Sequence, residues 1–332
     1  MIISRTPFRV SFFGGGTDYP DWYLEHGGQV LSTTIDKYCY IACRPLPPFF
    51  DYRYRVVYSR IETVKTIDQI RHPAVKAVLR HLNCRRGLSI NYDGDLPARS
   101  GLGTSSSFTV GLLNALYALR GQYSDADRLA REALHVEQVL IGEPVGSQDQ
   151  IAAAYGGFNR IRFHPGGAFQ VEPVIISTAK REALSEHLML FFTGISRYSA
   201  NVARSKIARL HQRTAQLQRI SAIVEEALRF LSSSEGSILP FGELLDEAWQ
   251  HKRTLSDQVT NPAIDDLYRE AHAAGAIGGK LLGAGGGGFF LLFVPPDRQA
   301  AVRQRLQRLT HVPLRFDNSG SKIVLYQPND PG

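Results

Sequence analysis

The chain has no long hydrophobic run and very few cysteines. No stretch of its 332 residues reaches the roughly 18 consecutive apolar residues that a membrane-spanning helix needs. The first residues already have a strand-like pattern and lack the apolar core of a secretory signal. We therefore expect a cytoplasmic protein with no membrane partner. Cys39, Cys43 and Cys84 are too few for a four-ligand zinc site, and the first two lie in an apolar, β-branched segment typical of a buried strand.

Internal repeats and low-complexity tracts are also missing, whereas the charge is clearly positive. The formal net charge is +7 and the pI is about 9.3, values that a nucleic-acid-binding protein would share. The basic residues are spread along the chain apart from one run at 204–219, where Lys206 and Arg209 are interleaved with apolar residues, as on the solvated face of an amphipathic helix. A positive charge equally suits anionic small substrates, so charge alone does not select a function.

The order of strand and helix patterns predicts a mixed α+β chain of two units. Strands are expected at 2–13, 29–44, 88–92, 158–163, 169–176, 188–192, 277–282, 288–294, 314–316 and 322–326, with a hairpin at 53–67. Helices are expected at 75–82, 105–119, 124–141, 199–231, 241–258 and 298–309, and after Pro262. The polar segment 177–185 divides the chain into units 1–182 and 183–332, since 332 residues exceed one typical core.

The strongest local motif is a loop rich in glycine and hydroxyl side chains, directly before the predicted helix 105–119. Residues 97–107 read Pro-Ala-Arg-Ser-Gly-Leu-Gly-Thr-Ser-Ser-Ser. Free backbone N–H groups at the glycines and the positive end of the helix would form a phosphate cradle, and the hydroxyls could hold a phosphate-bound cation. A capped helix after a flexible turn is the alternative. The loop is not a Walker A motif, because Gly-Lys-Ser/Thr is missing.

Two further segments contain glycine turns. Residues 280–288 satisfy Gly-x-Gly-x-x-Gly, but a strand follows instead of a helix, so the dinucleotide-binding interpretation fails. There the backbone either approaches a ligand closely or forms an ordinary β-turn. Residues 7–19 place Arg9 on a strand, then a glycine turn at 14–16 and then Asp18, which taken alone is compatible with an ordinary turn residue.

Two acids stand out by their positions. Glu137 falls on the apolar face of the predicted helix 124–141, where a carboxylate is seldom buried without a partner or a metal. Asp149 lies in a polar loop before an alanine-rich segment, where an acid also favours the start of a helix. Each position is equally compatible with a structural and a functional role.

Taken together and in this order, the three glycine-bearing segments resemble the motifs of the GHMP superfamily of small-molecule kinases, which includes galactose, homoserine, mevalonate and phosphomevalonate kinases. The resemblance covers most of the chain. It implies ATP as co-substrate and Mg²⁺ as cofactor. It also implies a ribosomal-protein-like, ATP-binding N-terminal domain over 1–182 and a ferredoxin-like C-terminal domain over 183–332, with the active site between them.

The resemblance also implies residue roles. Asp149 would be the catalytic base, kept ionised by the positive charge of Arg9. Glu137 and Ser105 would bind Mg²⁺, and the interval from Glu137 to Asp149 is one residue longer than in mevalonate kinases. The ATP phosphates would contact Ser100, Gly101, Leu102, Gly103, Thr104, Ser105 and Ser106. The substrate would contact Asp18, Thr17, Gly15, Gly16, Gly285 and Gly286.

Two segments indicate a branch of the superfamily. Gly-Gly-Gly-Thr-Asp-Tyr at 14–19 and Thr-Gly-Ile-Ser-Arg at 193–197 are similar to bacterial D-glycero-D-manno-heptose 7-phosphate kinases. The implied reaction is phosphorylation of the anomeric hydroxyl to the 1,7-bisphosphate, toward nucleotide-activated heptose for capsule, S-layer or lipopolysaccharide. Arg197, ahead of the predicted helix 199–231, would bind the sugar's own phosphate, because a helix N-terminus with a guanidinium is a natural phosphate site.

Three alternative functions compete with the heptose phosphate kinase. A fucose-type or other sugar kinase of the same superfamily would share all three motifs. An RNA-binding module is the remote alternative, and it lacks an RNP1-like aromatic motif and a KH-type Gly-x-x-Gly clamp in context. A subtilisin-type protease would share Gly-Thr-Ser at 103–105, but the His-Gly-Thr segment that supplies its base is missing. We therefore expect a sugar phosphate and ATP as partners, no nucleic acid, and a second copy of the chain as a candidate partner.

Overall fold

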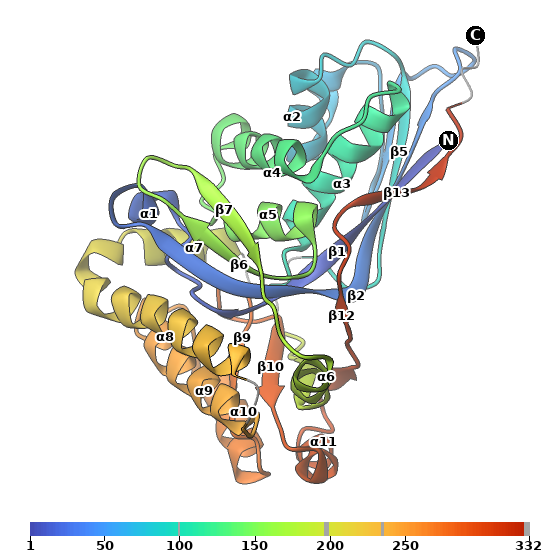
Figure 1. The fold of residues 1–332 in the computed structure, drawn as a ribbon. Helices are drawn as coiled ribbons and strands as arrows, with labels where there is room; N and C mark the ends of the chain where they lie inside the picture. Colours follow the sequence, from blue (N-terminus) through green and yellow to red (C-terminus); the bar gives the residue numbers. More distant parts are fainter. Residues whose placement is uncertain (99, 196–198, 234–235, 329–332) are drawn as a thin grey trace.

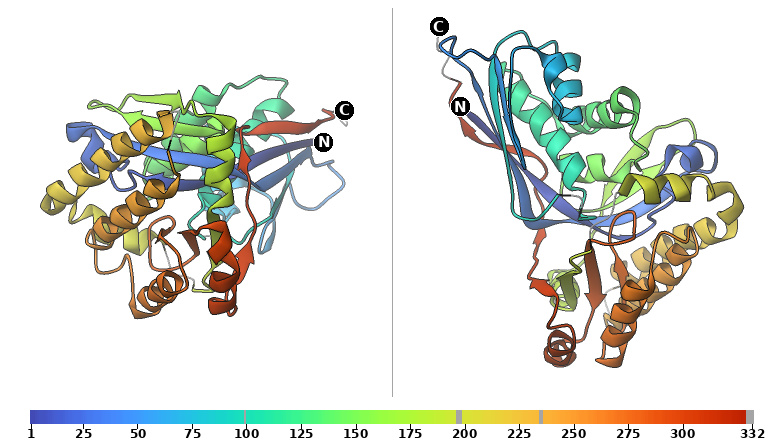
Figure 2. Two further views of the ribbon diagram at one scale, coloured as in Figure 1. Left: turned by 60° about the horizontal axis from the view of Figure 1, so that its bottom comes forward. Right: turned by 180° about the vertical axis from the view of Figure 1, so that it is seen from behind.

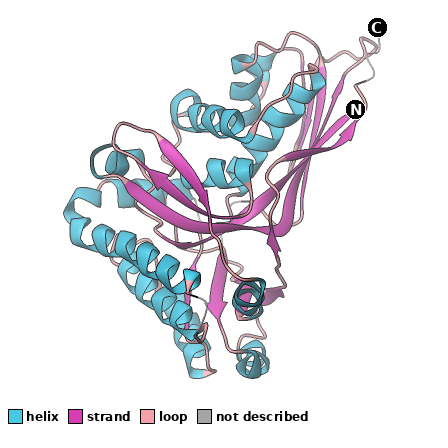
Figure 3. Ribbon diagram, in the orientation of Figure 1, coloured by secondary structure: helices cyan, strands magenta, loops and turns pink. Residues whose placement is uncertain are grey.

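The computed structural model describes residues 1–98, 100–195, 199–233 and 236–328, and two β-sheets organise it (Figures 1 and 3). The strands of the larger sheet are β1 (Ile2–Phe13), β2 (Gly28–Pro45), β3 (Tyr54–Val57), β4 (Ile61–Val64), β5 (Leu88–Gly94), β6 (Phe158–Phe163), β7 (Phe169–Pro173), β12 (Phe316–Asp317) and β13 (Lys322–Tyr326). Its main path is β13-β1-β2-β5-β3-β4; β12 and β6 also pair with β2, and β7 pairs with β6. The smaller sheet has the order β11-β8-β10-β9, with β8 (Leu188–Phe192), β9 (Gly278–Leu281), β10 (Phe289–Phe293) and β11 (Thr310–Val312).

Helices lie on both sides of the long strands (Figures 1 and 2). The helices before β8 are α1 (Pro20–His26), α2 (Pro73–His81), α3 (Thr104–Leu119), α4 (Ala126–Leu134), the π-helix η2 (His135–Ile141), α5 (Gln148–Tyr155) and α6 (Thr178–Glu186), with a 3₁₀ turn η1 (Ile67–Gln69). Those after β8 are α7 (Ser199–Ile207), α8 (Thr214–Ser232), α9 (Leu239–Arg253), α10 (Pro262–Ala273) and α11 (Gln299–Arg305), with 3₁₀ turns η3 (Leu210–Arg213) and η4 (Pro296–Arg298). None of the described helices combines the length and apolarity needed to cross a bilayer.

The antiparallel pair β1–β2 forms the centre of the molecule. Helices α3 and α5 pack on both strands, and α8 from the second half of the chain reaches the same two strands. Because both faces of β1 are covered, residues 6–13 are buried at every position instead of alternating. Helix α3 is also covered on all its faces, and every residue from Thr104 to Ala118 except Ser105 is buried. All three cysteines are buried, as the apolar context of Cys39 and Cys43 predicts.

Three expectations from the sequence need correction. The polar segment expected to separate the units forms α6, whose N-cap Ser177 accepts a hydrogen bond from the N–H of Lys180. The helix expected over 199–231 is divided into α7, η3 and α8. The division at 182/183 assigns β12 and β13 to the second unit, yet β13 pairs with β1 and β12 with β2 in the first sheet. Long-range strand pairing of this kind leaves no local signal.

Candidate active site

The loop before α3 is fixed by close contact with the glycine segment 283–288. Gly101 adopts φ +87°, and a Cβ at this position would lie 2.6 Å from the carbonyl oxygen of Leu282. A Cβ on Gly283 would in turn lie 2.5 Å from the Cα of Gly101, and the N–H of Phe289 donates to the carbonyl of Ser100 at 3.0 Å. Only glycine allows the two backbones to approach this closely. Two motifs that are about 180 residues apart in the chain therefore form one structural unit.

The N-terminus of α3 is open for a ligand. Its N-cap is Gly103, with φ +73°, so no side chain caps the first turn. The N–H groups of such a first turn lack partners within the helix and carry the positive end of its dipole. Ser105 is the exposed residue of this turn, whereas Thr104 and Ser106 are buried. Phosphate binding by this loop stays a prediction, with which the uncapped first turn is compatible.

Arg9 and Asp149 meet directly beneath this loop. Arg9, on β1, contacts one oxygen of Asp149, Oδ1, through Nε at 2.8 Å and through Nη2 at 2.6 Å. Its Nη1 donates to the carbonyl of Gly101 at 2.7 Å. A Cβ on Gly103 would lie 3.3 Å from Arg9 Cγ and 3.5 Å from Asp149 Cγ, so the loop rests on the pair. The structure thus brings together the residues predicted for catalysis and for phosphate binding.

Burial and Arg9 act on the pKa of Asp149 in opposite directions. Burial raises this pKa, Arg9 lowers it as expected, and the net pKa lies above the ordinary value of an aspartate. Arg9 thus favours the ionised carboxylate, although desolvation has the larger effect on the net pKa. A raised pKa makes Asp149 a stronger base than a solvent-exposed aspartate.

Asp18 lies next to the pair. Its Oδ1 accepts from the N–H of Gly16 at 2.9 Å, and its Oδ2 accepts from Nε2 of Gln148 at 2.8 Å. The Thr17 hydroxyl is fully buried and donates within the turn, to the carbonyls of Gly14 and Gln29, so its role is to hold the turn. Gly15 and Gly16 belong to the same turn, and a Cβ on Gly16 would lie 3.2 Å from two leucine side chains. Asp18 is thus the member of this group with carboxylate lone pairs left for a ligand.

Gly285 and Gly286, predicted to contact the substrate, pack against Val259. A Cβ on Gly285 would lie 2.7 Å from the carbonyl oxygen of Val259, and the N–H of Gly286 donates to the same carbonyl at 2.8 Å. These glycines allow the loop to pack on the segment after α9. Arg197, the predicted phosphate reader, lies outside the described residues.

Glu137 is buried in the π-helix η2 and turns inward. Its Oε2 accepts from the hydroxyl of Ser106 at 2.9 Å and from Nε2 of Gln150 at 2.5 Å, whereas Oε1 has no hydrogen-bond partner among the described residues. Burial raises the pKa of Glu137 to about 7, although the nearby hydroxyl and amide groups of Thr109, Ser106 and Gln150 counter it. A π-helical turn accommodates one residue more than an α-turn, so it is the local feature able to absorb the longer interval to Asp149.

Ser105 and Glu137, predicted to share a metal, are not in direct contact. Ser105 is exposed at the N-terminus of α3, and it is the neighbouring Ser106 that contacts Glu137. Successive residues of a helix point about 100° apart, so the hydroxyl of Ser105 is exposed and that of Ser106 faces the interior. Ser106 therefore contacts Glu137 directly, and the sharing of a metal by Ser105 and Glu137 stays a prediction.

Comparison with known proteins identifies the family. The model of the GHMP kinase N-terminal domain matches residues 68–157, and the model of the GHMP kinase C-terminal domain matches residues 207–311. The chain belongs to the GHMP kinases.

Individual relatives of this GHMP kinase align over nearly its whole length. A D-glycero-α-D-manno-heptose 7-phosphate kinase from Campylobacter jejuni is 28% identical and covers 92% of this chain and 93% of its own. A galactokinase from Pyrococcus furiosus is 26% identical and covers 92% of this chain and 93% of its own. Among solved structures, a D-glycero-D-manno-heptose 1-phosphate kinase from Bacteroides thetaiotaomicron superposes with a TM-score of 0.75, at 24% identity, over 97% of this chain and 98% of its own. The last similarity establishes the shared fold.

Three buried lysines of this GHMP kinase surround the Arg9–Asp149 pair, and the sequence interpretation missed all of them. Lys280 Nζ donates to the carbonyl of Phe12 at 2.6 Å, and Lys252 Nζ donates to the carbonyls of Leu281 and Gly283 at 2.8 and 2.7 Å. Lys206, on α7, is 3% exposed, although the interleaved pattern of 204–219 predicts a solvated face. That prediction is wrong for Lys206, whose side chain is buried with its Nζ 5.1 Å from the centre of the Tyr19 ring.

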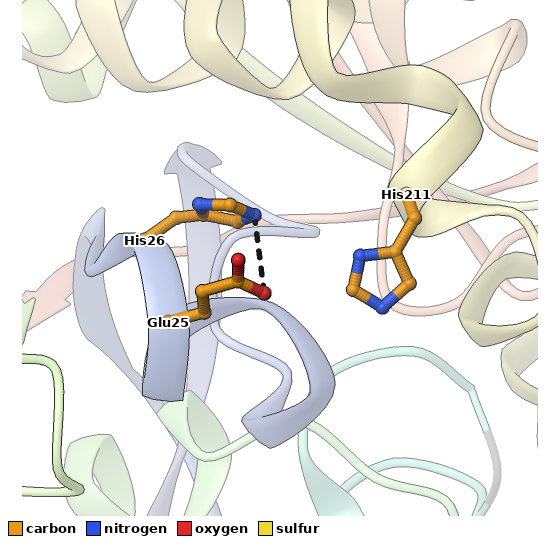
Figure 4. Close-up of side chains that lie close together, drawn as sticks. All are labelled: Glu25, His26 and His211. Carbon is orange, nitrogen blue, oxygen red and sulfur yellow. Dashed lines mark ion pairs between the residues drawn. The ribbon is translucent and has the colours of Figure 1, made fainter.

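A separate group of metal-binding side chain types lies at the surface. Among the described residues, Glu25 and His26 of α1 and His211 of η3 bring their ligand atoms within 4.8 Å of one another (Figure 4). All three are exposed, and Glu25 already contacts His26 at 3.7 Å. Imidazoles suit zinc or copper rather than Mg²⁺, so this group is distinct from the predicted magnesium site.

A cavity of about 750 Å³ lies on the α3 side of the GHMP kinase. Tyr58, Glu62 and Arg71 are among its lining residues. The ring of Tyr58 meets that of His72 edge-on at 4.8 Å, and His72 stacks on Phe108 of α3 at 4.7 Å. Phe108 is one turn from Thr104, so the cavity is joined to the phosphate loop by an aromatic contact chain.

The contact between the two glycine segments predicts a specific sensitivity at Gly101. We expect Gly101→Ala to lower kcat at least about tenfold and to reduce thermal stability, because the new methyl group would meet the backbone of Leu282 and displace the phosphate loop. Gly166→Ala is the matched control, since Gly166 has nearly the same φ, +85°, but nothing within 4 Å of the added Cβ. It carries only the left-handed backbone cost of about 1–2 kcal/mol. Equal effects of both variants on kcat would contradict the packing argument.

Proposed function

We propose that this chain phosphorylates the anomeric hydroxyl of D-glycero-D-manno-heptose 7-phosphate with ATP. The chain is a sugar kinase of the GHMP family, and the heptose assignment rests on its end-to-end similarity to the Campylobacter jejuni heptose 7-phosphate kinase. The observation that carries the chemistry is the Arg9–Asp149 pair beneath the open N-terminus of α3. The proposal places the reaction in the cytoplasm, where ATP and sugar phosphates are available, and its product would enter synthesis of a nucleotide-activated heptose.

The proposed reaction is a direct phosphoryl transfer. Asp149 accepts the proton of the anomeric hydroxyl as the sugar oxygen forms a bond to the γ-phosphorus, and the bond to the β–γ bridging oxygen breaks with its electron pair leaving on ADP. Arg9 occupies Oδ1 of Asp149, and no donor from the described residues reaches Oδ2, which is therefore the oxygen available for the proton. The N-terminal amides of α3 stabilise the phosphate charge, and Asp18 orients the sugar through its hydroxyls.

The residues around Glu137 fit a magnesium ion. The unpartnered, buried Oε1 of Glu137 is a hard oxygen ligand of the kind that Mg²⁺ prefers, and Ser105 offers a hydroxyl at the start of α3. When bound, Mg²⁺ would neutralise part of the phosphate charge. We further propose that the cavity lined by Tyr58 and Arg71 receives the nucleoside of ATP, because the ring contacts Tyr58–His72 and His72–Phe108 connect it to α3 one turn from Thr104.

A fucose-type sugar is the second candidate acceptor. A bifunctional fucokinase/GDP-fucose pyrophosphorylase from Arabidopsis thaliana is 29% identical over 91% of this chain, although the match covers only 30% of that protein. An ADP-release assay with heptose 7-phosphate, unphosphorylated heptose, fucose, galactose and mannose would separate the candidates. The proposal requires heptose 7-phosphate to have the highest kcat/KM; a higher value for fucose would replace it.

Removal of the proposed base is the most direct test of the chemistry. Asp149→Asn should lower kcat by about 10²–10⁴-fold and leave ATP affinity nearly unchanged, because the amide no longer takes the proton. Asp257→Asn, at an exposed aspartate paired with Arg209, is the control and should retain kcat. A decrease of less than about tenfold in Asp149→Asn, equal to about 1.4 kcal/mol, would remove Asp149 from the role of base.

The magnesium assignment predicts a pH-dependent metal requirement. Because burial raises the pKa of Glu137 to about 7, protons compete with Mg²⁺ below that pH, and the half-saturating Mg²⁺ concentration should rise as the pH falls from 8 to 6. Glu137→Gln should raise this concentration about tenfold or more at pH 8 and flatten its pH dependence, whereas the exposed Glu243→Gln should not. Ser105→Ala and Ser106→Ala, assayed side by side, would show which hydroxyl supports the ion. An unchanged Mg²⁺ requirement in Glu137→Gln would make Glu137 a structural residue.

A further inference from the structure

The charges buried around the active site do not balance. Arg9, Lys206, Lys252 and Lys280 are each at most 5% exposed. Their charges act on one another, since Arg9, Lys206 and Lys280 all lower the pKa of Lys252, after the larger effect of burial. The carboxylates that share this electrostatic environment are Asp18 and Asp149. Four basic side chains therefore face two carboxylates. Burial lowers the pKa values of all three lysines, repulsion from the other cations lowers those of Lys252 and Lys280 further, and a bound anion would favour their charged forms.

Three of the four cations have partners within the chain. Arg9 contacts Asp149 and the carbonyl of Gly101. Lys280 and Lys252 donate to backbone carbonyls that hold the end of β1 and the start of the glycine segment 283–288. Their ammonium groups therefore have positioning roles.

Lys206 is different. Its Nζ has no hydrogen-bond acceptor among the described residues and lies 5.1 Å from the centre of the Tyr19 ring. No ion pair joins it to a carboxylate in the described parts of the chain, although the charges of Asp18 and Asp149 both act on it. Burial still lowers the pKa of Lys206 to about 8 against the attraction of both carboxylates. An ammonium group has three donors, and all three remain available here.

The position of Lys206 is held by neighbouring contacts of α7. The hydroxyls of the adjacent Ser205 and of Ser256 lie 2.7 Å apart and share a hydrogen bond, and Val202 and Ala203 on the same helix are buried. The buried stem thus places the ammonium beside the Tyr19 ring, where the charges of Asp18 and Asp149 act on it without a direct ion pair among the described residues.

We propose that the ammonium of Lys206 binds a phosphate group of a reactant on the acceptor side of the active site. The proposal deepens the kinase function proposed above and rests on it. A phosphate supplies the negative charge that the chain itself lacks at this point, and its oxygens accept the three N–H donors of Lys206. Two sources share this chemistry: the γ-phosphate of ATP and the phosphate carried by the acceptor sugar.

The test measures binding of each source separately. Lys206→Met removes the charge but keeps the length and apolar stem, and Lys206→Gln keeps polarity without charge. One arm measures the affinities for the ATP analogue AMP-PNP and for ADP, which differ by the γ-phosphate. The other arm measures the affinity for heptose 7-phosphate in the absence of nucleotide. Loss of one charge-assisted contact should weaken binding about 10- to 100-fold in the arm that contains the true source.

A matched control separates this role from a general effect of removing a buried lysine. Lys180 is also buried, but its Nζ donates to the carbonyls of Phe230 and Ser233, both at 2.7 Å, in the second half of the chain. Lys180→Met should lower the melting temperature and leave both affinities unchanged. Lys206→Met should keep or raise the melting temperature of the free enzyme, because it removes a charge that burial disfavours.

Each outcome decides the proposal. A loss of AMP-PNP affinity with ADP affinity retained assigns Lys206 to the γ-phosphate, and a loss of heptose 7-phosphate affinity assigns it to the acceptor. Unchanged affinities in either folded variant, or a lowered melting temperature with unchanged affinities, would overturn it. If the wild-type enzyme fails to bind or phosphorylate heptose 7-phosphate, the acceptor assignment fails, whereas the AMP-PNP arm still tests Lys206.

Discussion

The close approach of two glycine-containing backbones is the constraint on which the active site depends. Gly101 and Gly283 leave no space between them for a side chain, and the N–H of Phe289 bonds to the carbonyl of Ser100 beside them. This contact joins the loop before α3 to the smaller sheet. It thereby fixes the position of Gly103 relative to Arg9 and Asp149. Because a shift of about 1 Å in a reacting group is costly for catalysis, the fold holds the phosphate loop by backbone contacts instead of flexible side chains.

Much of the fold follows from local patterns in the sequence. Continuous apolar, β-branched runs predict β1 and β2, and the glycine segments mark the turns at which helix and strand change. The Arg9–Asp149 pair was predictable because the three motifs together resemble the GHMP kinases, and that resemblance implies roles for both residues. Asp149 fits both the structural and the functional interpretation of its position, since it lies in the first turn of α5 and also contacts Arg9.

The buried cations were not predictable in the same way. Lys206 has the spacing of a surface residue, and only tertiary contacts, such as that with the Tyr19 ring, make it a buried one. Lys252 and Lys280 lie in ordinary helix and strand patterns, and their carbonyl partners come from other segments. The direct contact of Ser106 with Glu137 was also not predicted, because one position along a helix rotates a hydroxyl by about 100° and a motif does not specify that rotation.

The return of the last strands to the first sheet has a consequence for synthesis on the ribosome. Ile2 pairs with Tyr326, so one edge of β1 has no partner until almost the entire chain has been translated. At about 5–20 residues per second this interval lasts on the order of tens of seconds. An open, apolar strand edge is a template for aggregation during that time. The nascent chain therefore depends on early cover for β1, from α3 and α5 on one face and from chaperones at the edge.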